Sequence, residues 1–144
     1  MSSHLTSSHF TRICNEIIKL NRSIKFVGVA SNLGTLLVTS YRDGLIPLMT
    51  IEEAKHYAVQ AVLRAAISQD FSNKLGKLKH SIGTYDKLIR ATVPVKIEDN
   101  FQAKFFLLLS FDMGTNVKDI IENELLAYID KNLDLTASTH MRIG

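Results

Sequence analysis

Cysteine is almost absent from this sequence of 144 residues, where Cys14 is the single example. An internal disulfide therefore cannot form, and zinc sites of the Cys₄ or Cys₂His₂ type are excluded. A lone thiol suits a reducing compartment, so a cytoplasmic protein is expected. Cys14 falls in register with apolar Phe10, Ile13 and Ile17. This spacing predicts a small buried side chain and not a nucleophile, which would need a base close by.

Long hydrophobic runs are also missing. The longest covers residues 105–109, whereas a membrane helix needs about 20 apolar residues. The first ten residues are rich in serine and histidine and lack the apolar segment of a signal peptide. The net charge of +3 is too small to indicate a polyanionic partner. We therefore expect neither a membrane partner nor a nucleic-acid partner.

Motifs that carry catalytic or cofactor chemistry are absent as well. Neither a phosphate-binding glycine loop nor an H-E-x-x-H or G-x-S-x-G motif occurs in the sequence. No pair among the five histidines has the spacing of metal ligands; they are His4, His9, His56, His80 and His140. The adjacent carboxylates Glu52 and Glu53 are explained by a helix cap. We expect no catalytic residue, no cofactor and no metal, and hence a protein that is not an enzyme.

Prolines number only two, and no Gly/Ser-rich linker divides the chain. A single domain over residues 1–144 is predicted, with its core at about 7–131 and tails at 1–6 and 133–144. Hydrophobic periodicity predicts helices at 7–21, 51–67 and about 116–131, and strands at 24–30, 35–41, 77–82, 88–97 and 103–111. A short apolar connector, residues 45–49, precedes the middle helix, and residues 98–100 form a turn.

The middle helix and the last strand are the most informative elements. Thr50 and Glu53 have the T-x-x-E spacing of a capping box. The helix that follows carries small apolar residues on one face, which permits close packing. The last strand is apolar on both faces, so it is expected to be central and covered on both sides. The predicted fold class is α+β, a five-stranded and mainly antiparallel sheet flanked by helices in the order α-β-β-α-β-β-β-α.

Basic side chains gather around one hairpin: Lys74, Lys77, Lys79, Lys87 and Arg90. Lys77 and Lys79 alternate with Leu78, His80 and Ile82, which favours the polar side of an edge strand protected against aggregation. The alternative is a surface that faces phosphate groups or nucleic acid. Arg90 differs, because it lies within an apolar strand. If its side chain points inward it needs a partner, and Asp112 or Asp43 could serve.

The order of elements resembles the roadblock/longin/profilin-like group of domains. The hairpin from Phe26 to Met49, FVGVASNLGTLLVTSYRDGLIPLM, is similar to the roadblock opening hairpin, in which a buried strand turns at small residues and returns to Asp-Gly. The run from Ile24 to Ile129 also looks like an archaeal protein family without an assigned activity. The roadblock resemblance implies dimerisation through the middle helix and an adjacent strand, and a role as a platform for small GTPases or larger assemblies. The order is also compatible with PAS or GAF sensory domains.

Two functions follow from these observations. The leading hypothesis is a non-enzymatic interaction or scaffold module that acts as a homodimer. Its candidate dimer interface comprises Ala54, Ala58, Ala61, Val62, Ala65, Leu78 and Ile82. The alternative is a small-molecule-sensing domain with a pocket between the sheet and the middle helix. Its candidate ligand residues are Tyr57, His80 and Arg90.

Overall fold

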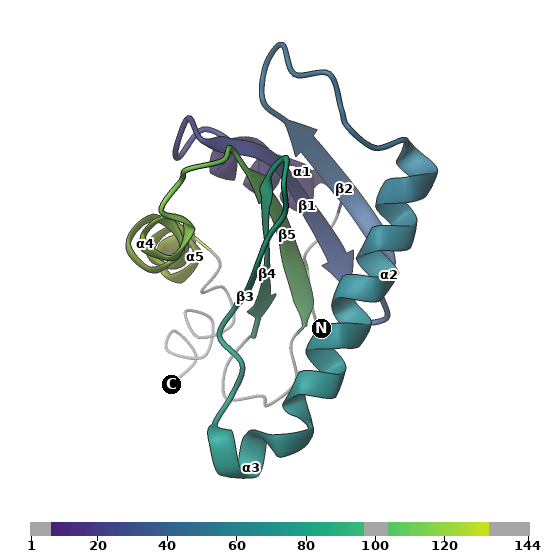
Figure 1. Cartoon of the computed structure of the whole chain (residues 1–144), viewed down its shortest axis with the longest axis vertical. Helices are drawn as coiled ribbons and strands as arrows, with labels where there is room; N and C mark the ends of the chain where they lie inside the picture. The colour runs from purple at the N-terminus through teal and green to yellow at the C-terminus, as the bar shows by residue number, and fades with distance from the viewer. Residues whose placement is uncertain (1–6, 97–103, 133–144) are drawn as a thin grey trace.

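The computed structural model describes residues 7–96 and 104–132, and within them it shows a sheet covered by helices on both faces (Figure 1). The helices are α1 (Ser7–Ile17), α2 (Ile51–Ser68), α3 (Ser72–Leu75), α4 (Val117–Ile120) and α5 (Leu126–Asn132). A 3₁₀ turn (Gln69–Phe71) joins α2 to α3, and a π-helical segment (Ile121–Leu125) joins α4 to α5. The strands are β1 (Ile24–Ser31), β2 (Leu36–Tyr41), β3 (Ser81–Thr84), β4 (Ile89–Val95) and β5 (Phe105–Phe111).

The five strands form one antiparallel sheet in the order β2-β1-β5-β4-β3. β5 is therefore the middle strand, hydrogen-bonded to β1 on one side and to β4 on the other. All seven of its residues are buried. Burial on both faces is the reason for its unbroken apolar sequence. The predicted fold class and the central position of the last strand are confirmed.

Each face of the sheet has its own hydrophobic core. On one face α1 and the α4–α5 segment pack over side chains such as Val27, Leu107 and Phe111. On the other face α2 packs alone over Phe26, Phe106 and Leu108, as its position on one side of the sheet in Figure 1 shows. Alternate residues along β5 thus serve different cores. The fold is a three-layer arrangement in which α2 is the only helix of its layer among the described residues.

Local sequence signals explain where the helices begin. The Thr50 hydroxyl accepts a hydrogen bond from the Glu53 backbone N–H at 3.1 Å, and the Glu53 carboxylate accepts one from the Thr50 N–H at 2.9 Å. This is the predicted capping box. It provides acceptors for two backbone N–H groups that have no hydrogen-bond partner within the helix. Asn116 caps the last helical segment by accepting from the Asp119 N–H.

The structure corrects several predicted boundaries. α1 ends at Ile17, and the chain continues as a turn to residue 20. β3 starts only at Ser81, because residues 76–80 are irregular and do not pair with the sheet. The predicted strand at 77–82 is therefore shifted toward the turn at residues 85–87. The two tails, His4, His140, the turn at 98–100 and the ends of its two flanking strands lie outside the described residues.

The turn between β1 and β2 packs against α2. Gly34 has a φ of +90°, and a Cβ there would lie 3.2 Å from the Val59 Cα. Both features favour glycine, since other residues rarely adopt this φ and since a Cβ at this distance would force the neighbouring helix backbone to shift by a few tenths of an ångström. The tip of the hairpin is thus fixed against the middle of α2.

Gly34→Ala is expected to lower the free energy of unfolding by about 2 kcal/mol, through the unfavourable φ and the crowding of Val59. Gly44→Ala is the matched control, because Gly44 has a φ of +78° but no atom within 4 Å of the place that a Cβ would occupy. That control is expected to cost only about 1 kcal/mol, from backbone strain alone. Urea unfolding of the two variants measures the difference, and equal losses would show that the contact with Val59 contributes nothing.

Candidate functional site

Helix α2 carries an exposed apolar row on its outer side, and the first residue of this row, Val59, borders the turn between β1 and β2. Val59, Leu63 and Ile67 are 51%, 58% and 58% exposed, and they recur every four residues along the helix. Residues at this interval lie above one another on one side of a helix. Phe71 and Leu75 continue the exposed apolar sequence beyond the end of α2. We refer to Val59, Leu63 and Ile67 as the outer row of α2.

The alanines predicted to form a dimer interface lie on the opposite side of this helix. The buried residues of α2 are Ala54, Ala58, Ala61, Val62 and Ala65. Four of them belong to the core beneath α2, where they contact the chain's own sheet. Their small size lets α2 approach the large side chains of β1 and β5. These residues are therefore not available to a second molecule, and an interface on α2 would have to use the outer row.

The other predicted residues near β3 separate onto different faces. Leu78 packs with the core beneath α2. Ile82 is opposite Ala91 on β4, so it points to the face covered by α1 and α4–α5. The His80 Nε2 lies 3.6 Å from a carboxylate oxygen of Glu122 in the π-helical segment. The expectation that Leu78, His80 and Ile82 share one face is wrong, because residues 76–80 are not in a strand and do not alternate.

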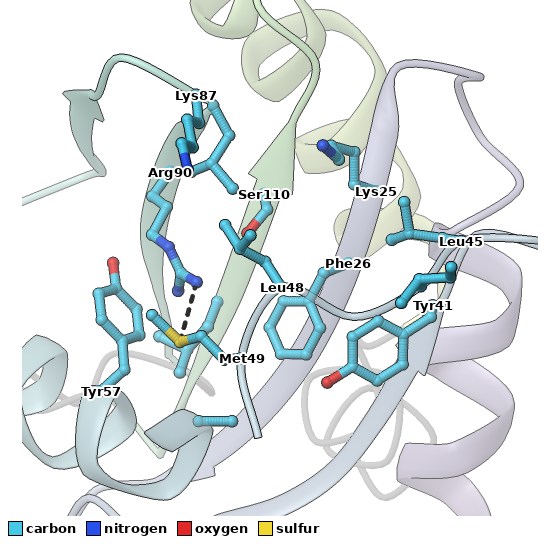
Figure 2. Close-up of a pocket in the computed structure, with 14 residues that line it drawn as sticks. Lys25, Phe26, Tyr41, Leu45, Leu48, Met49, Tyr57, Lys87, Arg90 and Ser110 are labelled. Carbon is cyan, nitrogen blue, oxygen red and sulfur yellow. Dashed lines mark hydrogen bonds between the residues drawn. The ribbon is translucent and has the colours of Figure 1, made fainter. Parts of the chain in front are cut away.

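A pocket of about 260 Å³ lies between α2, the loop before it and the sheet. Figure 2 shows Lys87, Arg90 and Tyr57 along one side, with Phe26, Tyr41 and Leu45 along the other. The loop residues Leu48 and Met49 lie between these two sides. The full lining consists of Lys25, Phe26, Tyr41, Leu45, Ile46, Leu48, Met49, Ala54, Tyr57, Lys87, Leu88, Arg90, Leu108 and Ser110. This is where the sequence predicted a pocket, between the sheet and the middle helix.

Arg90 is the central polar group of this pocket. Its guanidinium carbon lies 3.9 Å from the centre of the Tyr57 ring. One Nη–H points at the Met49 sulfur at 3.3 Å (dashed in Figure 2). A thioether is a weak acceptor, so most donors of the guanidinium remain without a protein acceptor in the described residues. Of the three candidate ligand residues, Tyr57 and Arg90 lie together at this pocket, whereas His80 lies near Glu122 on the other side of the sheet.

Asp112, one of the two acidic partners suggested for Arg90, forms its ion pair with Arg42 instead. Asp112 accepts two hydrogen bonds from Arg42, at 2.7 and 3.1 Å, in a bidentate pair. These bonds hold the pKa of the Asp112 carboxyl below its usual value, although partial burial opposes them and Lys25 adds a smaller attraction. Asp43 forms no ion pair with Arg90 either. The expectation that Asp112 or Asp43 neutralises Arg90 is wrong, and an aromatic ring takes that place.

The single cysteine behaves as a core residue. Cys14 is fully buried in α1, and burial raises the pKa of its thiol to about 12. A thiol in that state is not a nucleophile at neutral pH. In residues 7–96 and 104–132, no group of three or more His, Cys, Asp and Glu side chains could hold a metal ion. Over the same ranges, no helix has the length and apolar character needed to cross a membrane.

Most residues of the pocket lining could not be identified as such from the sequence. The sequence predicts strands at the positions of Lys25 and Tyr41. It predicts only a connector from Leu45 to Met49, and Lys25, Tyr41 and this connector all contribute to the pocket lining. The available signal was the apolar character of that connector, which is unusual for a loop. Apolar side chains in a loop are expected to pack against other apolar surface, and here the loop forms one wall of the pocket.

Comparison with known proteins supports the fold. No protein-family model matches the sequence, and no curated protein does, so the resemblance to an archaeal family stays a prediction. Among solved structures, MglB from Myxococcus xanthus is similar over 98% of this chain and 94% of its own, with a TM-score of 0.64 and 14% identity. An MglB structure described as having a tetrameric arrangement covers 83% of this chain and 82% of its own, with a TM-score of 0.62 and 12% identity.

A Roadblock/LC7 domain from Streptomyces avermitilis is similar over 92% of this chain and 95% of its own, with a TM-score of 0.57 and 10% identity. Identities this low carry information about architecture and none about activity. They agree with the strand order and with the helices on both faces of the sheet. The chain therefore has a roadblock-like fold, shared with MglB and the Roadblock/LC7 domain.

Proposed function

We propose that this protein is a non-enzymatic interaction module that self-associates through the outer row of α2. The observation that carries the proposal is the exposure of Val59, Leu63 and Ile67 in one line along an 18-residue helix. Scattered exposed apolar residues are normal on protein surfaces, but a continuous row indicates an interface. From Val59 to Ile67 the row spans eight residue steps, about 12 Å at 1.5 Å per residue, and Phe71 and Leu75 extend the exposed apolar surface beyond the end of the helix.

The proposed occupant of this surface is a second copy of the chain. A row at four-residue intervals can interdigitate with an identical row on another helix, and a two-fold axis allows the same patch to be used twice. The tetrameric arrangement of an MglB structure is consistent with self-association in this fold. Among the described residues β3 pairs with β4 alone, so its outer edge is a second candidate contact.

A platform for another protein is the next step of the proposal. The resemblance to roadblock domains implies such a role, with a small GTPase as one class of partner. The self-associated molecule would leave the opposite layer, formed by α1 and α4–α5, free for that partner. Surfaces of this kind act by presenting a shape and a charge pattern, and they need no catalytic group.

Self-association is tested by sedimentation velocity of the unmodified protein over a range of concentrations. We expect a species of twice the 16.1 kDa chain mass that dissociates on dilution. The mass, and not retention on a column, is the readout, because shape also affects retention. A protein that stays at the mass of one chain up to the highest soluble concentration would contradict the proposal.

A further inference from the structure

We infer that the pocket between α2 and the sheet binds a small organic anion, with a carboxylate or phosphate group attached to an apolar body. This inference goes beyond the interaction function and rests on other residues. None of the outer row of α2 lines the pocket. Where α2 does contribute, it does so from its inner side, through Ala54 and Tyr57.

The charge of the lining points to an anion. Lys25, Lys87 and Arg90 are basic, and no aspartate or glutamate is among the lining residues. Of the three, Lys25 has Asp112 as a neighbour. Arg90 and Lys87 form no ion pair with any carboxylate in the described residues. Two cations at one pocket without a counter-charge attract an anion from solution.

The geometry of Arg90 prepares it for a planar anionic group. Its guanidinium stacks on Tyr57, and Met49 takes one donor. Stacking occupies a face of the guanidinium and leaves its edge donors for hydrogen bonds. Those donors match the paired oxygens of a carboxylate or phosphate. Lys87 and Arg90 both line the pocket and lie along the same side of it in Figure 2, so both can contact the same group.

The rest of the pocket is mainly apolar and therefore favours a ligand with an apolar body. Phe26, Leu45, Leu48 and Leu108 line it with hydrocarbon surface, and Figure 2 shows the Phe26 ring and Leu48 across from Arg90. An inorganic anion would leave this surface in contact with water. The volume of about 260 Å³ lies just below the usual range of ligand pockets, roughly 300–1,000 Å³. The ligand is therefore small, of the size of a single ring with a short chain.

Titration of the ¹⁵N-labelled full chain with 4-phenylbutyrate, followed by NMR, tests the inference. We expect saturable shifts of resonances from the pocket lining. Removal of the negative charge in 4-phenylbutanamide is expected to weaken binding at least ~10-fold, because a charge-assisted hydrogen bond is lost. Phenyl phosphate tests whether phosphate replaces carboxylate. Inorganic phosphate is expected to bind far more weakly than either, because it lacks the apolar body.

Variants locate the site. Arg90→Gln is expected to weaken binding of 4-phenylbutyrate or phenyl phosphate at least ~10-fold, and Lys87→Gln is expected to weaken it less. Lys19→Gln, on the exposed side of the turn after α1, removes the same charge far from the pocket and should leave binding unchanged. Should Arg90→Gln fail to fold, Lys87→Gln, which changes an exposed side chain, carries the test. Equal binding of acid and amide, equal binding by Lys87→Gln and Lys19→Gln, or no shift in the pocket with any probe would overturn the inference.

Discussion

Leu63→Glu is expected to convert the self-associated protein into a monomer, with the association weakened at least ~100-fold. Leu63 is the middle residue of the outer row of α2, between Val59 and Ile67. In a symmetric contact each copy would place one glutamate in the interface, and two carboxylates would be removed from water close together. Their desolvation and mutual repulsion oppose association from both sides.

The same substitution should hardly affect folding. Leu63 is more than half exposed in the single chain, and surface substitutions usually change stability by less than about 0.5 kcal/mol. Sedimentation velocity reports the assembly, and urea unfolding at low protein concentration reports the fold. Thr11→Glu, at an exposed position of α1 on the other side of the sheet, adds the same charge and should leave assembly unchanged. A Leu63→Glu protein that still sediments at the wild-type mass would place the interface elsewhere.

Phe111→Ala is expected to lower the free energy of unfolding by about 3–5 kcal/mol. The Phe111 side chain is fully buried at the end of the central strand, opposite Ile24 on β1 and Ile89 on β4. It belongs to the core under α1 and α4–α5, so its loss removes apolar surface and leaves a cavity that close-packed neighbours cannot fill. A loss of this size is a large part of the total stability of a domain.

Phe71→Ala is the matched control, since Phe71 is 65% exposed. The same chemical change there should cost less than about 0.5 kcal/mol. Both variants are made in the Leu63→Glu background, so that self-association does not contribute to the measured stability. Urea unfolding monitored by circular dichroism gives the two values. Similar losses at the two positions would mean that Phe111 is not part of a packed core.

Much of the fold could be predicted because its signals are local. The capping box at Thr50 and Glu53 marks the start of α2 through bonds between residues three apart. The apolar sequence of β5 indicates burial on both faces, which only a central strand in a covered sheet provides. β3 was predicted less well, because Leu78 and His80 alternate with lysines although they precede the strand. Alternation alone does not show whether a partner strand is hydrogen-bonded there.

The candidate site was predicted only in part, for the same reason. Tyr57 and Arg90 were expected at one pocket, and the structure brings them together. The partner of Arg90 was not predictable, because Asp112 could equally serve Arg42, and their bidentate pair forms only when β2 and the end of β5 are aligned. Likewise, a helix that is apolar on two sides does not reveal which side its own sheet will cover.

The sequence by itself determined the order of the elements, the central place of β5, the start of α2 and the burial of Cys14. Each depends on periodicity or on contacts within a few residues. The tertiary structure alone decided that the alanines of α2 face the sheet while Val59, Leu63 and Ile67 remain outside. It also decided that Arg90 stacks on Tyr57 in a pocket without an acidic residue. Both outcomes depend on how distant segments of the chain pack. For α2 the physical reason is that its small side chains allow the helix to lie close over Phe106 and Leu108.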